Sequence, residues 1–132
     1  MTYQYDRSKL AFGDSLWKDI QDAFGRFTSR LAREILSDLP DWGMVEAGGS
    51  GAMNQMKSRI ELVGIDGPYL GSNLVFLLGI GNDLMVSGSI AFRKDPDVTM
   101  PTSRTDFEFD SFTSTSNAAR TLITKVKREL LR

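Results

Sequence analysis

The stretch that decides the fold, residues 73–94, reads NLVFLLGIGNDLMVSGSIAFRK. Two apolar runs flank the segment Gly81-Asn82-Asp83, and such runs, rich in Val, Ile and Phe and broken by Gly and Asn, are typical of a β-hairpin. The first run, residues 74–78, does not alternate, which indicates a strand covered on both faces. The second run alternates and places one apolar set on one side: Leu84, Val86, Gly88, Ile90 and Phe92. A hairpin with such an apolar face needs helices to cover it.

Apolar residues at three- and four-residue steps predict a helix near each end of the chain. The first helix begins at Asp14 or Ser15, which are both good N-caps, and ends where Pro40 prevents continuation. Its apolar stripe comprises Trp17, Ile20, Phe24, Phe27, Leu31, Ile35 and Leu39. The last helix follows several N-cap candidates at residues 113–116. Its stripe comprises Ala119, Leu122, Ile123, Val126 and Leu130.

Two further segments alternate between apolar and polar residues, which predicts half-buried strands at residues 56–65 and 104–111. Residues 40–54, with four glycines, and residues 95–103, with two prolines, lack periodicity and are predicted to be loops. The order is therefore helix, four strands, helix. Consecutive strands without alternating helices imply an antiparallel sheet. We predict a two-layer α+β fold, in which a four-stranded antiparallel sheet is flanked by a long N-terminal helix and a C-terminal helix.

The 132 residues are expected to form a single domain, because a chain of this length can bury a sizeable core. Residues 1–13, in which Tyr3 and Tyr5 alternate, would form an arm or an edge strand. The chain has no run of about 18 apolar residues and no basic segment followed by an apolar one at its start. We therefore expect neither a membrane span nor a secretory signal, and a cytoplasmic location.

The chain contains no histidine and no cysteine. Ser-His-Asp and Cys-His catalytic arrangements are therefore impossible within it, as are zinc sites built from imidazole or thiolate. Carboxylates, lysines, tyrosines or a hard cation are what remains for catalysis. The composition therefore favours a protein that is not an enzyme, and we expect no cofactor.

One predicted strand carries Asp106, Glu108 and Asp110 on the same face. Three carboxylates at this spacing could share Mg²⁺ or Ca²⁺ with other oxygen ligands, which would suit a carboxylate-dependent enzyme or a small-ligand binder. No second acidic cluster offers further ligands, however. We expect these charges to face Lys57 and Arg59 on a neighbouring strand, and we expect no metal site. The glycines at 48–51 and 79–84 lack the remainder of a phosphate-binding motif, so they are predicted to form turns.

Basic residues are concentrated on the two predicted helices, although the net charge of the chain is -1. If the helices pack side by side, these residues could form one ridge that contacts phosphates. The residues are Arg26, Arg30, Arg33, Lys125, Lys127 and Arg128. No aromatic residues are interleaved with them, and no known nucleic-acid-binding signature is present. A nucleic-acid-binding accessory protein is therefore the alternative interpretation.

Two helices can cover only one face of the sheet, so the apolar run at 74–78 would leave either Val75 and Leu77 or Leu74, Phe76 and Leu78 uncovered. An apolar patch left open on a sheet typically marks an interface. Met85 belongs to the same patch, and Trp42 and Met44 form an apolar pair that either packs on the core or contacts a partner. The predicted partner-binding residues are therefore Trp42, Met44, Val75, Leu77 and Met85.

These observations favour a non-catalytic protein-interaction or assembly module that masks or bridges a macromolecular partner. An adaptor, a small inhibitor, a chaperone-like protein or a phage-type structural subunit would fit. A second copy of the chain is the commonest partner for such a patch, which predicts a homodimer related by a two-fold axis.

Overall fold

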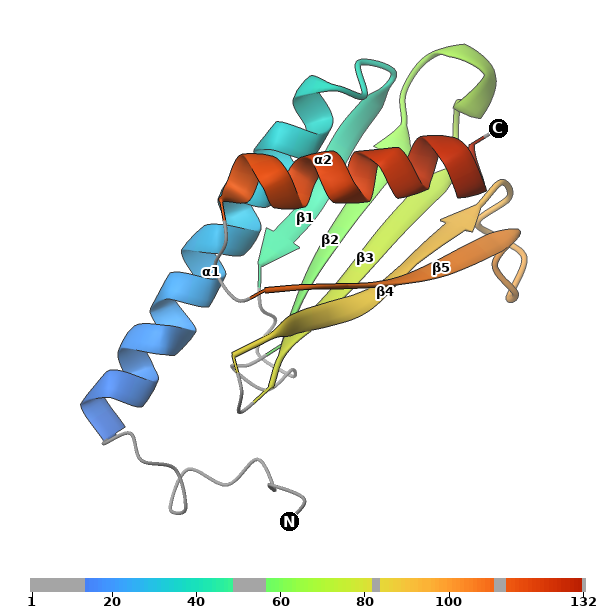
Figure 1. Ribbon diagram of the computed structural model, residues 1–132. Helices are drawn as coiled ribbons and strands as arrows, with labels where there is room; N and C mark the ends of the chain where they lie inside the picture. The colour runs from blue at the N-terminus through green and yellow to red at the C-terminus, as the bar shows by residue number, and fades with distance from the viewer. Residues whose placement is uncertain (1–13, 49–56, 82–83, 111–113, 132) are drawn as a thin grey trace.

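The computed structural model describes residues 14–48, 57–81, 84–110 and 114–131. Its elements follow one another in the order α1 (Asp14–Ser37), β1 (Trp42–Gly48), β2 (Lys57–Gly64), a short 3₁₀ helix η2 (Gly67–Tyr69), β3 (Asn73–Ile80), β4 (Val86–Arg93), β5 (Ser103–Phe109), α2 (Thr115–Lys125) and a π-helical turn η3 (Val126–Leu130). The strands form one antiparallel sheet in chain order, and both helices lie on the same face of it (Figure 1). The predicted α+β class and the helix–sheet–helix order are confirmed.

The sheet has five strands, one more than the sequence predicted. The additional strand is β1, within the segment that was predicted to be a loop. Its alternation is broken because a β-bulge between Met44 and Glu46 shifts the register against β2, and because Gly43 and Gly48 weaken the strand signal. The prediction of a four-stranded sheet was therefore wrong at this edge. Residues 49–56, with the rest of the predicted loop and the expected first residue of the next strand, lie outside the described residues.

The central hairpin is confirmed. β3 and β4 pair without interruption from Asn73 opposite Arg93 to Ile80 opposite Val86. Residues 82 and 83, at the predicted turn, lie outside the described residues, as do residues 1–13 and the first N-cap candidate of the last helix, Thr113. The long helix ends at Ser37, before Pro40, as expected from the loss of the backbone donor at proline.

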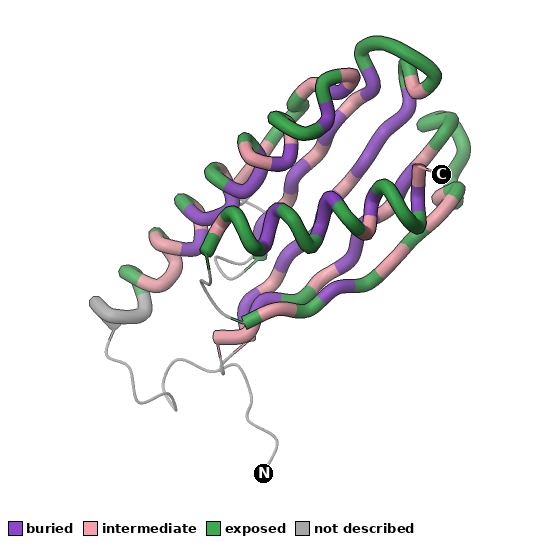
Figure 2. Tube along the Cα trace, turned by 45° about the horizontal axis from the view of Figure 1, so that its top comes forward, coloured by how far each residue is buried: buried purple, intermediate pink, exposed green. Residues whose placement is uncertain are grey.

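The core lies between the sheet and the two helices, where buried positions of α1 and α2 face buried positions of the strands (Figure 2). The first predicted stripe is buried in this layer from Phe24 to Leu39, with Ile20 partly buried, and the stripe of the last helix is buried throughout. The side chain of Trp17 lies outside the described ones. Each large buried side chain contributes about 1.5–3 kcal/mol through removal of apolar surface from water. The largest fully buried side chains are Phe24, Leu31, Ile35, Ile60, Leu62, Leu74, Phe76, Val86, Ile90, Leu122 and Val126.

A buried polar pair joins the first helix to the sheet. The hydroxyl of Thr28 donates to the carbonyl oxygen of Phe24 at 2.9 Å and lies 2.8 Å from the hydroxyl of Ser58 on β2. Because both residues are almost fully buried, these bonds satisfy groups that water cannot reach. The pair therefore contributes to the position of α1 over the β2 side of the sheet.

The other end of the core is closed by an aromatic cluster. Tyr69 stacks on Trp42 with ring centroids 5.9 Å apart and meets Phe92 edge-on at 5.8 Å. Its hydroxyl donates to the carbonyl oxygen of Leu131, which attaches the end of the last helix to the connection between β2 and β3. Trp42 is therefore part of the core, which is one of the two alternatives that the sequence left open for it.

The register decides which face of the central strand is covered. Leu74, Phe76 and Leu78 point towards the helices and are buried, whereas Val75 and Leu77 point to the opposite face. That opposite face is called the open sheet face below, because no described element covers it. The two apolar alternatives of the sequence are thereby resolved in favour of Val75 and Leu77 as the uncovered pair.

Candidate functional site

The open sheet face contains a hollow of about 390 Å³, called the sheet groove below. Its floor comes from side chains of β2, β3 and β4, while Arg104 of β5 and Pro96 and Pro101 of the connection after β4 form one side. The charged and polar residues of the lining are Arg59, Glu61, Asn73, Ser89, Arg93 and Arg104, and its apolar floor consists of Val75, Leu77 and Ala91. The groove therefore combines an aliphatic floor with converging polar groups, which is the usual composition of a binding site.

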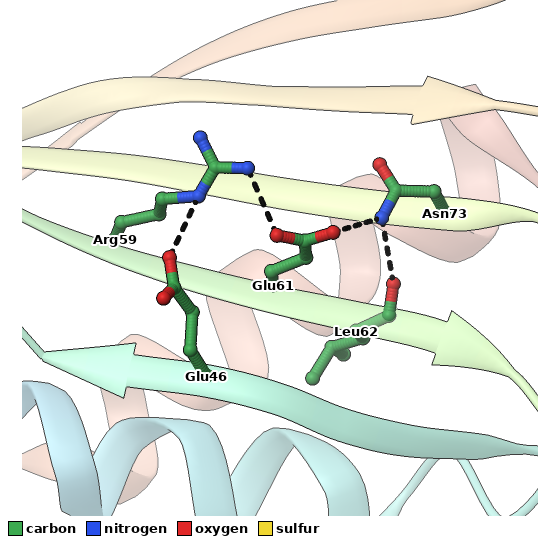
Figure 3. A network of polar contacts seen from close by, with 5 residues as sticks. All are labelled: Glu46, Arg59, Glu61, Leu62 and Asn73. Carbon is green, nitrogen blue, oxygen red and sulfur yellow. Dashed lines mark hydrogen bonds and ion pairs between the residues drawn. The ribbon is translucent and has the colours of Figure 1, made fainter. Parts of the chain in front are cut away.

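On the β1–β3 side of the groove one arginine is shared between two carboxylates (Figure 3). Arg59 contacts Glu46 through Nε at 3.0 Å and Glu61 through Nη2 at 2.9 Å. Asn73 donates from Nδ2 to the second carboxylate oxygen of Glu61 at 2.9 Å and to the carbonyl oxygen of Leu62 at 3.3 Å. Glu46 and Glu61 lie directly opposite each other in the sheet, an arrangement that is destabilising for like charges. Arg59 compensates this repulsion because it bridges both carboxylates.

On the β4–β5 side of the groove the charges are not compensated in this way. Arg93 is half-buried, and its side chain makes no hydrogen bond or ion pair with any described residue. Arg104 has its Nε 3.9 Å from Asp106 Oδ1, but these side chains are 64% and 82% exposed, so solvent leaves the pair little strength. Glu61 makes no ion pair with either arginine, and its side-chain contacts are with Arg59 and Asn73. This side therefore presents two guanidinium groups that remain available.

Exposed apolar side chains gather at the end of the sheet where the groove lies. Leu77 in the floor is 40% exposed, Val98 and Met100 protrude from the connection that forms the groove wall, and Ile65 and Leu70 protrude from the connection between β2 and β3. These two connections lie at the same end of the sheet (Figure 1). Of these exposed apolar residues Leu77 alone lines the groove, and Met44 and Val45 of β1 are exposed as well. Single exposed apolar residues need no explanation, so the groove itself is the feature that indicates a contact surface.

The predicted partner-binding residues occupy different places. Val75 and Leu77 lie in the sheet groove, as predicted for an uncovered pair. Trp42 is only 5% exposed and offers almost no surface to a partner, while Met44 lies opposite Leu62 on the edge strand and thus on the helix side of the sheet. Met85 is half-buried immediately before β4, and its carbonyl oxygen accepts a hydrogen bond from the backbone of Gly81. The groove thus brings two of the five together.

The predicted basic ridge is divided between separate hollows. Arg26, Arg30 and Arg33 line a hollow of about 600 Å³ whose described lining comes from α1 alone. Lys127 lines another hollow, of about 280 Å³, together with Asp38 and Asp41. Lys125 is half-buried and Arg128 is exposed on the last helix. The separate hollows do not indicate one continuous basic surface. Nucleic-acid binding by these six residues stays a prediction.

The acidic strand does not have the neighbours that the sequence predicted. Asp106 and Glu108 lie on the open sheet face opposite Ser89 and Ser87 of β4, because β5 pairs with β4 and is separated from β2 by two strands. The expectation that these carboxylates face Lys57 and Arg59 was therefore wrong. Asp110 follows the strand and is exposed. Within the described ranges, no three acidic side chains lie close enough together to hold a metal ion.

The arginines of the β4–β5 side were not identified from the sequence. A signal was present, because Arg93 continues the side of the second hairpin strand that carries Ser87, Ser89 and Ala91. Arg104 likewise lies on the face of β5 opposite to the buried one. What the sequence did not supply was the order of the strands, which decides that these two residues lie on neighbouring strands.

Comparison with known proteins finds no family model, no curated protein and no solved structure that matches this chain. Of the helices in the described ranges, none has the length and apolar character needed to cross a lipid bilayer.

Proposed function

We propose that this chain is a non-catalytic protein-interaction module that binds a segment of a partner protein in the sheet groove. The observation that carries the proposal is the hollow of about 390 Å³ on the sheet face that no described element covers. Its aliphatic floor would bury apolar side chains of the partner, and its polar rim would supply directional hydrogen bonds.

The chemistry of the groove suits recognition better than catalysis. Its polar lining consists of guanidinium, hydroxyl and amide groups and of one carboxylate, Glu61, whose two oxygens already accept bonds from Arg59 and Asn73. A general base needs an oxygen or nitrogen within reach of a substrate proton, and Glu61 is committed elsewhere. Donors and aliphatic groups are what a binding surface needs.

A second copy of the chain is one partner that this surface could take, because homodimers with two-fold symmetry are the commonest oligomers. A dimer formed through the groove would bury Leu77, so the variant Leu77→Asp would place an unpaired charge in the interface. Sedimentation equilibrium at tens of micromolar should then show a dimer for the native chain and a monomer for the variant. A native chain that sediments as a monomer would exclude the second copy as the partner.

The general test uses a photo-crosslinking amino acid at position 77 in the source cells. The matched control carries the same amino acid at Thr124, which is exposed on α2 at the opposite side of the molecule. We expect one discrete crosslinked protein from position 77 and none from position 124. The captured protein is then purified, and its affinity for the native chain should fall at least roughly ten-fold in Leu77→Asp. Crosslinks from both positions, or an affinity that the variant leaves unchanged, would contradict the proposed function.

A further inference from the structure

The charges that line the sheet groove do not balance. Three arginines and one glutamate line it, Arg59, Arg93, Arg104 and Glu61, so its lining carries two positive charges in excess. The glutamate is bonded on one oxygen to Arg59 and on the other to Asn73. Arg59 is also shared with Glu46 beside the groove, whereas among the described residues Arg93 has no ion pair and Arg104 has only the exposed one with Asp106. The arginines open to a ligand are therefore the two of the β4–β5 side.

The register brings these two arginines close together. Arg104 of β5 is directly opposite Ala91 of β4, and Arg93 follows Ala91 by two residues on the same face. Diagonal neighbours of this kind have Cα atoms roughly 7–8 Å apart, within reach of long side chains that converge on one group. Guanidinium groups that converge on one point repel each other, and an anion bound between them offsets this repulsion.

A third unused donor lies beside them. Ser89 is 8% exposed and lines the groove, and its hydroxyl makes no hydrogen bond with any described residue. It lies on the face of β4 that carries Ala91 and Arg93, and it is directly opposite Leu77 of β3. Positively charged donors, a hydroxyl donor and an aliphatic side chain therefore meet within one hollow.

We propose that the sheet groove recognises an acidic segment of the partner protein, with one carboxylate held between Arg93 and Arg104 and a neighbouring apolar side chain packed on Leu77. The proposal rests on the proposed function and adds the chemistry of its partner. Arginine suits this role because its planar guanidinium can bind a carboxylate through two parallel hydrogen bonds.

The surroundings of the groove favour a short acidic segment over a nucleic acid. Glu46 lies beside Arg59 at one side, and Asp106 and Glu108 lie on β5 at the other. A phosphate chain that crossed the groove would pass these carboxylates within about one Debye length, roughly 8 Å at physiological salt, and would be repelled. A single carboxylate that enters the hollow avoids most of this repulsion.

The test is a selection of random twelve-residue peptides, displayed on phage, against the full chain. Three variants are screened in parallel: Arg93→Glu with Arg104→Glu, Leu77→Asp, and the control Arg26→Glu with Arg30→Glu, which changes the same charge on α1. Circular dichroism and thermal unfolding check that each variant is folded. We expect the native chain and the control to enrich peptides that combine Asp or Glu with a large apolar residue.

The reversed groove should instead enrich basic peptides, and it should bind the acidic peptides at least roughly ten-fold more weakly, because each charge-assisted hydrogen bond contributes about 1.5–3 kcal/mol. Peptides that need Leu77 but carry no acidic residue would overturn the carboxylate inference and leave the proposed function in place. No groove-dependent enrichment in the native chain, or a loss of binding in the α1 control, would overturn both. A single-stranded oligonucleotide that binds more tightly than the acidic peptides and depends on Arg93 would also overturn the inference.

Discussion

The two faces of the central strand β3 carry similar side chains and use them differently. Phe76 points to the helices and is fully buried, whereas its neighbour Leu77 points to the open sheet face and is 40% exposed. The covered face is apolar apart from a few hydroxyl residues such as Ser58, while the open face surrounds its few aliphatic residues with arginines, carboxylates and Asn73. Most of the apolar burial that stabilises the fold therefore lies on one face of this sheet, and the other face is the one that we propose for binding.

The largest expected contrast is between these two neighbours. Phe76→Ala should lower the free energy of unfolding by about 3–5 kcal/mol, because it opens a cavity in the core, whereas Leu77→Ala should lower it by less than about 1 kcal/mol. Urea denaturation of both variants measures the difference. Equal losses would show that the open sheet face is as well packed as the covered face.

A smaller contrast concerns two serines. Ser58→Ala removes the buried partner of the Thr28 hydroxyl and should cost about 1 kcal/mol, since a hydrogen bond in the core is lost. Ser89→Ala is the matched change on the open sheet face and should alter the unfolding free energy by less than about 0.5 kcal/mol. The same denaturation experiment compares them. A larger change in the unfolding free energy for Ser89→Ala would mean that this hydroxyl stabilises the fold and is not available to a ligand.

The smallest contrast lies within the open sheet face. Arg59→Ala leaves Glu46 opposite Glu61 without the bridging cation and should cost about 0.5–1 kcal/mol, most of which added salt would remove. Arg93→Ala removes a cation that has no counter-charge among the described residues, so it should leave stability unchanged or raise it slightly. Thermal unfolding at low and high salt measures both changes. A loss at Arg93 as large as that at Arg59 would contradict the distinction between the two sides of the groove.

The sequence predicted those parts of the fold that depend on local periodicity. The apolar stripe from Phe24 to Ile35 and the alternation from Val86 to Phe92 each repeat at the period of their element, and both were identified correctly. Strand β1 was missed because its bulge between Met44 and Glu46 interrupts the period of two.

The candidate site was predicted only in part, because it depends on contacts between strands. Val75 and Leu77 were expected on an uncovered face, since a two-sided apolar strand under one helical layer must expose one side. The contact of Arg59 with Glu46 needs strand β1, which the four-stranded prediction lacked. The approach of Arg93 to Arg104 depends on the pairing of β4 with β5, because the sequence did not supply the order of the strands. The same missing strand order led to the wrong neighbours for Asp106.

We propose that ligands bind to the open sheet face and not to the helical layer. Methyl chemical-shift mapping tests it most directly, with an acidic peptide from the selection titrated into the full chain. The methyl signals of Val75, Leu77 and Ala91 should shift together and saturate, while that of Ala23 on α1 should not change. Shifts confined to Ala23 and its neighbours on α1, with the three groove signals unmoved, would contradict the claim.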